Sequence, residues 1–490
     1  MALPLFLLLF VYLSIPSTSD AFWSQSDASY ISATISEAGL VFAKDLLVER
    51  AVDSLTPLRL PDIEKSVRIP VLGGVNMAAT NITLSGISIS SSTVQPGESG
   101  IVIVASGATA NLTMDWFYSY STWFIPIEVS DKGSALVQVE GMEVGLTMTM
   151  ENKNGTLKLT VTQCGCYMEN LVIKLDGGAS WLYQGFLNAF ADNIRSSVED
   201  AITKNIFEGA QKLDSLLKTV PKKIDVDKIS ALNVTFVNDP HITNSSVEFD
   251  INGLFVSSEN AFAYKYLHKT SLLSNSCGRT QKMLSILLDE VVFNSASSIY
   301  FQAGVMHWMV DKVPEQSLLN TASWKYIIPQ LYKKYPNDDM LLNISLTSAP
   351  VIRITPQKIG ATILLDMTVD VLDSGETIPV ACIAMVVSVS GVMEISGNTL
   401  AAQVGLDDFT LSLKWSKVGN FHMYLIQGVI RVFLNTVFVP YVNMHLRQGF
   451  PLPIIDGFTL QNANILTVSS GISICSDVAF NTSAGLHSSF

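Results

Sequence analysis

Two cysteines one residue apart, Cys164 and Cys166, come nearest in this 490-residue chain to the spacing of a reactive or metal-binding site. A structural zinc site needs four ligands in a tetrahedron, so this pair would supply only half of one. None of the six histidines lies near another in the sequence. We therefore expect no metal and no cofactor. Because the total of five cysteines is odd, at least one thiol is free or intermolecular.

Adjacent carboxylates are a second candidate for chemistry, as an acid and base pair. Glu199-Asp200 and Asp407-Asp408 each lie beside apolar residues, on faces that we predict to be solvated. The sequence contains no Gly-x-Ser-x-Gly or His-Glu-x-x-His motif, no P-loop and no dinucleotide-binding glycine motif. It therefore predicts that the protein is not an enzyme.

Apolar residues recur at every fourth position in two long stretches of the chain. Residues four apart lie one above another on an α-helix, so each stretch predicts a long helix with an apolar stripe. The first stripe consists of Leu182, Phe186, Phe190, Ile194, Val198, Ile202 and Ile206. The second consists of Phe421, Leu425, Val429, Phe433 and Val437, with a neighbouring row at Ile426, Ile430, Leu434 and Phe438.

A strand-turn-strand pattern precedes each stripe. The turns are Asn154-Gly155 in the first half and Ser396-Gly397-Asn398 in the second, each between segments of alternating apolar residues. Gly155 lies 26 residues before Trp181, and Gly397 lies 24 residues before Phe421. This matched order predicts an internal duplication in which each half is a sheet against a long helix.

Shorter helices are predicted at corresponding places in the two halves. Asp27 can cap a helix whose apolar positions run from Ile31 to Leu55 and which ends at Pro57. Its counterpart is predicted to begin at Met283, Leu287 and Val291.

The composition indicates a secreted chain that buries an unusual amount of apolar surface. It is 48% hydrophobic and 15% charged, against roughly 25% charged in typical soluble domains. Residues 1–19 are predicted to be a signal peptide, because the apolar run at 3–13 is too short to span a bilayer and small residues follow it. Polar residues interrupt 418–441, so we expect no spanning helix there. Seven sequons predict glycosylation at Asn81, Asn111, Asn154, Asn233, Asn244, Asn343 and Asn481.

Three local sequences, taken in order, resemble one known family. Residues 447–453, Arg-Gln-Gly-Phe-Pro-Leu-Pro, resemble the exit of the second long helix in the bactericidal/permeability-increasing and lipopolysaccharide-binding protein family. Residues 162–166 with Trp181-Leu182 resemble the first half of that family, and residues 293–296 with Tyr300 resemble its second half. The resemblance extends from about residue 30 to residue 478.

The resemblance implies an α+β fold. It is an elongated boomerang of two pseudo-symmetric barrels, each a twisted antiparallel sheet wrapped on a long helix, joined by a central sheet. We expect a lipid-binding barrel at 20–220, a linker with central-sheet strands at 221–250, a second lipid-binding barrel at 251–453, and a return strand and tail at 454–490. Family members hold phospholipid in the barrels, which implies acyl-chain contacts here at Leu182, Phe186, Phe190, Ile194, Leu425, Val429 and Phe433.

The chain departs from the family in its cysteines. The family's disulfide joins the second cysteine of the 162–166 motif to the long helix, and the matching helix position here is at or beside Ile206-Phe207. Cys164, Cys277, Cys382 or Cys475 must therefore replace that partner, or the Cys166 thiol is free.

The chain also departs from the family at the tip of the first barrel. The matching segment has no Lys or Arg, and six of the nine residues 116–124 are aromatic. Such rings suit a lipid interface, but two strands packing inward would explain them equally well. The tip aromatics are Trp116, Phe117, Tyr118, Trp123 and Phe124.

The charge balance narrows the expected partners. Residues 22–220 carry 13 basic and 21 acidic side chains, which disfavours nucleic acid and predicts an acidic, non-mammalian member of the family. We expect an extracellular protein that binds the acyl chains of lipopolysaccharide, in an innate-immunity role, or that carries host phospholipids instead. A membrane surface and a membrane receptor are further expected partners.

Overall fold

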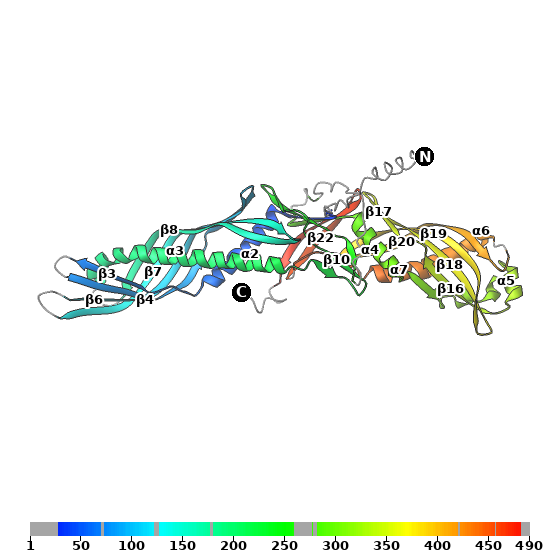
Figure 1. Ribbon diagram of the computed structural model, residues 1–490, viewed down its shortest axis with the longest axis horizontal. Helices are drawn as coiled ribbons and strands as arrows, with labels where there is room; N and C mark the ends of the chain where they lie inside the picture. Colours follow the sequence, from blue (N-terminus) through cyan, green and yellow to red (C-terminus); the bar gives the residue numbers. More distant parts are fainter. Residues whose placement is uncertain are drawn as a thin grey trace, which may run out of the picture.

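The computed structural model describes residues 28–69, 73–121, 127–176, 180–258, 277, 282–419, 422–455 and 457–481. The molecule is long and narrow, with a sheet-and-helix lobe at each end and a central sheet between them (Figure 1). The predicted α+β architecture of two such units joined by a central sheet is confirmed.

The N-terminal lobe is a seven-stranded antiparallel sheet packed on a long helix. Its sheet order is β2-β4-β6-β7-β8, with β3 paired to β4 and β5 to β6. Helix α3, Ser180–Thr219, contributes to the same core cluster as the sheet, and α2, Glu37–Leu55, precedes the strands. The strands are β2 Leu58–Arg59, β3 Ile63–Ile69, β4 Gly73–Ser88, β5 Ser91–Gly97, β6 Gly100–Ser121, β7 Glu128–Lys153 and β8 Thr156–Asp176.

The C-terminal lobe repeats this plan with a different helix. The sheet order is β15-β16-β18-β19-β20-β21, with β17 paired to β18. A continuous helical segment covers it, formed by α6 Met423–Phe433, a π-helical turn η3 Leu434–Phe438, and α7 Val439–Leu446. The strands are β15 His307–Val310, β16 Asp339–Leu346, β17 Val351–Thr355, β18 Lys358–Asp373, β19 Glu376–Ser396, β20 Thr399–Ser416 and β21 Phe450–Pro451.

The central sheet takes equivalent strands from both halves of the chain. Its order is β11-β12-β1-β14-β23-β22. The two middle strands, β1 and β14, directly precede helices α2 and α4. The outer pairs, β11-β12 and β22-β23, are hairpins that follow the long helix of the N-terminal and C-terminal lobe, respectively. The strands are β11 His241–Ile242, β12 Ser246–Ile251, β1 Ile31–Ser36, β14 Leu284–Asp289, β23 Gly471–Phe480 and β22 Phe458–Val468. Beside it lie a small sheet of β13 Phe255–Ser257, β10 Ser230–Asn233 and β9 Lys223–Asp225, and helix α4 Glu290–Gln302.

Both predicted hairpins are present. β7 and β8 are joined at Asn154-Gly155, where both residues have positive φ (56° and 84°), as a tight hairpin turn requires. β19 and β20 pair from Ser396 opposite Thr399, and Gly397 again has positive φ (59°). Together with the symmetric central sheet, these turns bear out the expected duplication.

The predicted starts of the two shorter helices are wrong in the same way. Residues 31–36 and 284–289 are strands, and the helices begin after them at Glu37 and Glu290. The Ser36 side chain accepts a hydrogen bond from Gly39 N, and Asp289 accepts one from Val291 N. These residues are the N-caps, because each satisfies a backbone N–H that has no partner in the first turn. The proposed cap Asp27 lies outside the described residues.

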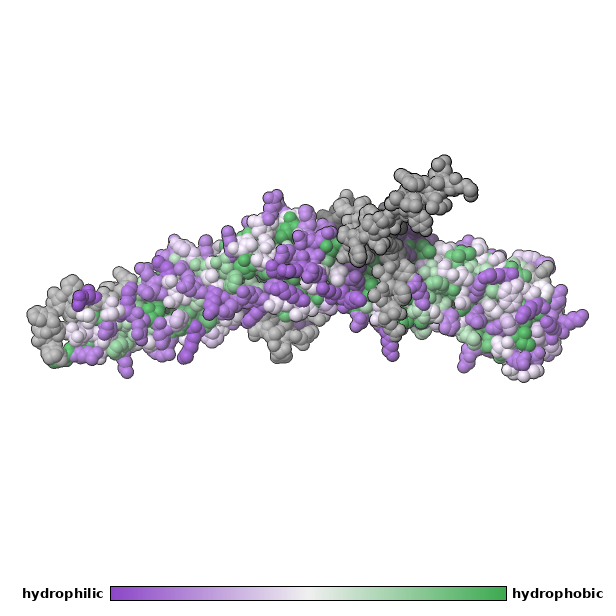
Figure 2. Space-filling view, viewed as in Figure 1, coloured by the Kyte–Doolittle hydropathy of each residue, from purple (hydrophilic) through white to green (hydrophobic). Residues whose placement is uncertain are grey.

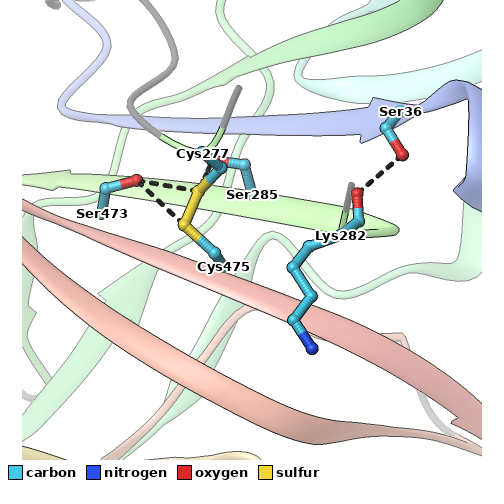
Figure 3. The surroundings of a disulfide bond; sticks show 6 residues. All are labelled: Ser36, Cys277, Lys282, Ser285, Ser473 and Cys475. Atoms are coloured by element: carbon cyan, nitrogen blue, oxygen red, sulfur yellow. Dashed lines mark hydrogen bonds between the residues drawn. A yellow bond between two sulfur atoms is a disulfide. The ribbon is translucent and has the colours of Figure 1, made fainter. Parts of the chain in front are cut away.

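A disulfide joins Cys277 to Cys475 of β23, with 5.8 Å between their Cα atoms (Figure 3). It lies beside Ser285 and Ser473, on neighbouring strands of the central sheet. Nearby, Ser36 Oγ donates to the carbonyl of Lys282 at 2.7 Å. The covalent cross-link is thus in the central sheet, and Cys166, like Cys164 and Cys382, is a free thiol.

Candidate functional site

The first apolar stripe lies in the core of the N-terminal lobe. Phe190 is 8% exposed, and Ile194 and Val198 are fully buried against the sheet. Phe190 and Ile194 therefore point into the core of the lobe. The side chains of Leu182 and Phe186 lie outside the described residues.

The aromatic segment of β6 packs mainly inward. Trp116 and Tyr118 are each 9% exposed and belong to the core cluster of the lobe. Their rings stack at 6.1 Å between centroids, Tyr118 stacks on Tyr120 at 6.3 Å, and Trp116 Nε1 donates to the carbonyl of Ser134. Of the proposed tip aromatics described here, only Phe117 faces outward.

The structure therefore decides between the two interpretations of this segment. Because alternate residues of a strand point to opposite faces, Trp116, Tyr118 and Tyr120 share the core side and cannot present a lipid-facing edge together with Phe117. The membrane-wedging role for Trp116 and Tyr118 is wrong. Trp123 and Phe124 lie outside the described residues.

The C-terminal lobe contains an apolar cavity of about 350 Å³ between its helix and its sheet. This volume is at the lower end of the roughly 300–1,000 Å³ found for small-molecule sites. Among the lining residues, Glu315 is the only one with an ionisable carboxylate. The helix contributes Ile426, Val429, Ile430, Val432, Phe433, Thr436 and Val437 to its wall. The sheet contributes Met340, Leu342, Met367, Val369, Val380 and Ile383.

The second apolar stripe only partly matches the side of the helix that faces this cavity. Val429 and Phe433 line it, as expected. Leu425 is 41% exposed and is absent from the lining, so the prediction that it faces the second barrel is wrong. The neighbouring row at Ile426 and Ile430 is buried in its place.

Helix geometry explains the displaced stripe. At 3.6 residues per turn, a step of four residues turns the side chain by about 40° beyond a full circle. A row of strict four-residue spacing therefore shifts by about 40° at each step, and the first described residue of this row, Leu425, lies beyond the face that packs on the sheet. The π-helical turn at Leu434–Phe438 adds a further change of phase, and its first and last residues are both buried.

Sequence reasoning missed one wall of the cavity. The segment between β15 and β16 contains two short 3-10 helices, Gln316–Leu319 and Thr321–Trp324, and helix α5, Pro329–Lys334. The apolar side chains that it places on the cavity are Val313, Pro314, Leu318, Leu319, Trp324, Ile328 and Leu331. These residues follow neither a helical nor a strand period over a useful length, so no periodic pattern could have assigned them.

Burial disfavours the thiolate form of both neighbouring cysteines. Burial raises the pKa of the Cys166 thiol to about 12, and the nearby Glu199 carboxylate and Cys164 add to the rise. Burial raises the pKa of Cys164 as well. Cys164 lines an open hollow between β8 and α3, together with Asp200, Lys204 and Phe207. Within the described ranges, no group of three His, Cys, Asp or Glu side chains is placed to hold a metal ion.

The sequon asparagines differ in accessibility. Five are exposed: Asn81, Asn111, Asn154, Asn244 and Asn481. Asn233 and Asn343 are only half-exposed, on strands β10 and β16. The Asn233 side-chain oxygen also accepts from both the backbone N–H and the hydroxyl of Thr235, the hydroxyl residue of its own sequon.

The helix Met423–Leu446 is long and apolar enough to cross a membrane by length and composition. It packs on the C-terminal sheet through Ile426, Ile430 and Phe433, yet only 33% of its most apolar 18-residue stretch is buried. A large share of an apolar helix therefore faces outward in this lobe.

Comparisons with known proteins match both lobes. Residues 39–220 match the model of the LBP / BPI / CETP family, N-terminal domain, and residues 224–480 match that of the C-terminal domain. A BPI/LBP family protein of Arabidopsis thaliana is 51% identical over 476 residues, covering 97% of this chain and 96% of its own.

More distant relatives carry functional names. The bactericidal permeability-increasing protein of Sebastes schlegelii is 25% identical, covering 90% of this chain and 93% of its own. The lipopolysaccharide-binding protein of Homo sapiens is 23% identical, covering 88% of this chain and 90% of its own. The crystal structure of a lipopolysaccharide binding protein superimposes with a TM-score of 0.63 at 20% identity, covering 92% of this chain and 99% of that one, which shows the shared fold.

Proposed function

Because the chain belongs to the LBP / BPI / CETP family, we propose that it is a secreted, non-enzymatic protein that holds the acyl chains of an amphiphile inside its lobes. The observation that carries the proposal is the apolar cavity under helix Met423–Leu446. Acyl chains would fill it at about 0.8 kcal/mol for each buried CH₂ group. The polar headgroup would remain at the mouth, in contact with water.

Bacterial lipopolysaccharide is the first candidate ligand. Relatives across most of the chain's length are named for binding it. Since the N-terminal half is acidic, binding would depend on acyl-chain burial more than on ion pairs with lipid phosphates. A carrier or transfer role for host phospholipids is the alternative, and the lack of a basic residue in the segment 115–124 favours it.

Lipid extraction tests the general proposal. The secreted protein should yield acyl lipid, near two molecules per chain, on organic extraction and mass spectrometry. The extracted protein should then take up a fluorescent phospholipid dispersed in detergent. A chain that is lipid-free and cannot be loaded would contradict acyl-chain binding.

A salt titration separates the two ligands. Affinity for immobilised lipopolysaccharide should fall only weakly with added salt, because surface charges are screened over about 8 Å at physiological ionic strength while acyl burial is not. A steep fall would point to a cationic site instead. Loading with phosphatidylcholine but no binding of lipopolysaccharide would favour the host-lipid carrier.

A further inference from the structure

Exposed aromatic rings occur at the outer end of the C-terminal lobe. Tyr326 is 83% exposed, Tyr424 is 72% exposed and Trp415 is 38% exposed. Tyr326 precedes α5, Tyr424 lies in the first turn of α6, and Trp415 is next to last in β20. Tyr and Trp prefer the boundary between water and lipid, because each combines an apolar ring with a polar group.

The elements that carry Tyr326 and Tyr424 lie at one end of the lobe. α5 and the start of α6 lie together at the end remote from the central sheet (Figure 1). Gly419, between β20 and α6, lies against the side chain of Gln330 in α5. The segment around α5 and the helix α6 also line the same cavity.

The same two segments are basic within their own bounds, although Asp339, Asp373 and Glu376 of the adjoining strands lie at the same end of the sheet. The whole chain has a formal net charge of −13. Residues 316–337 nevertheless contain Lys325, Lys333 and Lys334 and no acidic residue, although Glu315 and Asp338 flank them. Residues 409–455 likewise contain four basic residues and no acidic one: Lys414, Lys417, Arg431 and Arg447. Of these, Lys414 is already paired with Asp366.

Cations lie directly against two of the exposed rings. Lys325 Nζ is 4.7 Å from the ring centroid of Tyr326, and Lys417 Nζ is 5.6 Å from that of Trp415. The apolar face of α6 also reaches the surface at Leu425 and Val432, which are 41% and 51% exposed. Hydrophobic residues are visible on the surface of this lobe in Figure 2.

We propose that this end of the C-terminal lobe docks on an anionic phospholipid bilayer. The lysines would contact lipid phosphates, the rings would lie at headgroup depth, and the exposed face of α6 would contact the acyl region. Val432 belongs both to that face and to the cavity wall, so docking would bring the cavity next to the lipid. This inference rests on the proposed lipid-binding function and names the surface from which lipid would enter.

Vesicle flotation tests the docking. The full-length secreted protein should float with vesicles of phosphatidylcholine and phosphatidylglycerol, and more weakly with phosphatidylcholine alone. The double variant Lys325→Glu/Lys417→Glu should bind the anionic vesicles at least about tenfold more weakly, since it replaces two positive charges near such a surface by two negative ones. Tyr326→Ser/Tyr424→Ser should weaken binding to both kinds of vesicle.

Matched changes in the N-terminal lobe serve as controls. Lys132→Glu/Lys153→Glu reverses two exposed lysines there, and Tyr167→Ser removes a ring that is 64% exposed. These controls should float as the unchanged protein does. An equal loss of vesicle binding in the control and the C-terminal variants would overturn the proposal, and so would unchanged binding in all of them. Failure of the unchanged protein to float would also overturn it.

Loading from detergent separates this docking from the proposed function. The docking variants should take up fluorescent phospholipid from micelles as well as the unchanged protein, because their cavity is intact. Failure of every protein to load would contradict lipid binding itself, whereas normal loading with unaltered flotation would contradict only the docking end.

Discussion

Ile31 in β1 lies opposite Leu288 in β14, and this antiparallel pairing runs on to Ile35 opposite Leu284. The strands that open the two halves of the chain therefore pair with each other at the middle of the central sheet. Each is flanked by a strand from the hairpin that ends its own half. The duplication thus builds one shared core, and neither half completes the sheet alone.

The two N-caps should contribute comparable stability. Ser36→Ala and Asp289→Ala each remove a side chain that accepts from the first turn of a helix, so each should lower the free energy of unfolding by about 1 kcal/mol. Ser36 should cost more, since it also donates to the Lys282 carbonyl. Denaturant unfolding measures both. Ser54→Ala, at an exposed hydroxyl within α2, should change stability by less than about 0.5 kcal/mol, and a larger effect there would contradict the capping account.

A charged side chain introduced on helix α3 should destabilise the protein only where the replaced residue is buried. Phe190→Asp places a carboxylate in the N-terminal core, and we expect it to lower stability by about 3 kcal/mol or more or to abolish secretion. Phe207→Asp changes the same residue type on the same helix at a position that is 39% exposed, and should be secreted normally. Secretion level and thermal unfolding compare the two. Equal behaviour would mean that the stripe does not decide the packing of α3.

The cavity should be the lipid site of the C-terminal lobe. Val429→Trp fills the space between helix and sheet, so it should reduce the number of fluorescent phospholipids bound per chain. Leu425→Trp adds the same side chain on the outer face and should leave the stoichiometry of loading from detergent unchanged. Unaltered loading of Val429→Trp would place the lipid elsewhere.

The thiols should report the disulfide pattern. The denatured, unreduced chain should titrate as three thiols and the reduced chain as five, because Cys277 and Cys475 are joined. A titre of one would mean a second disulfide and would contradict free Cys166.

The reactivity of Cys166 should depend on folding. Burial raises its pKa from 9.0 to about 12, so at pH 8 the folded protein has roughly a thousandfold less thiolate there than the unfolded chain. The rate of alkylation of Cys166 in the native protein should therefore be low at pH 8 and should rise with pH above 9. Peptide mass spectrometry measures this rate. Cys166→Ser identifies the contribution of this residue. Fast labelling at pH 8 would show that the site is open.

Glycans should follow accessibility. The five exposed sequons, including Asn154 at a hairpin tip, should carry glycans in the secreted protein, whereas Asn233 and Asn343 should not. Asn233 and Asn343 are only half-exposed on their strands, which leaves less room for a glycan than at the five exposed sites. Glycopeptide mapping decides each site, and a modified Asn233 would contradict this assignment.

Local patterns in the sequence predicted the turns and the long helix, because their residue types or spacing are characteristic by themselves. The Asn154-Gly155 and Gly397 turns are visible because few residues adopt positive φ, and the long helix α3 because its apolar row continues over many turns. The strands before α2 and α4 were mistaken for helix. Alternating apolar residues at 31–35 and 284–288 also fit part of a helical row, and only pairing between the halves makes them strands.

The sequence by itself determined the duplication, the apolar composition, the resemblance to one family and the two apolar helices. The tertiary structure decided which side of each element faces inward. Trp116 and Tyr118 became core because β6 turns that face to α3, and Leu425 became surface because it lies beyond the face of α6 that packs on the sheet. The cavity wall at 313–331 and the basic aromatic end beside it come from segments brought together only by folding. A contact between distant parts of the chain leaves no periodic pattern in the sequence, so these contacts could not be predicted from the sequence.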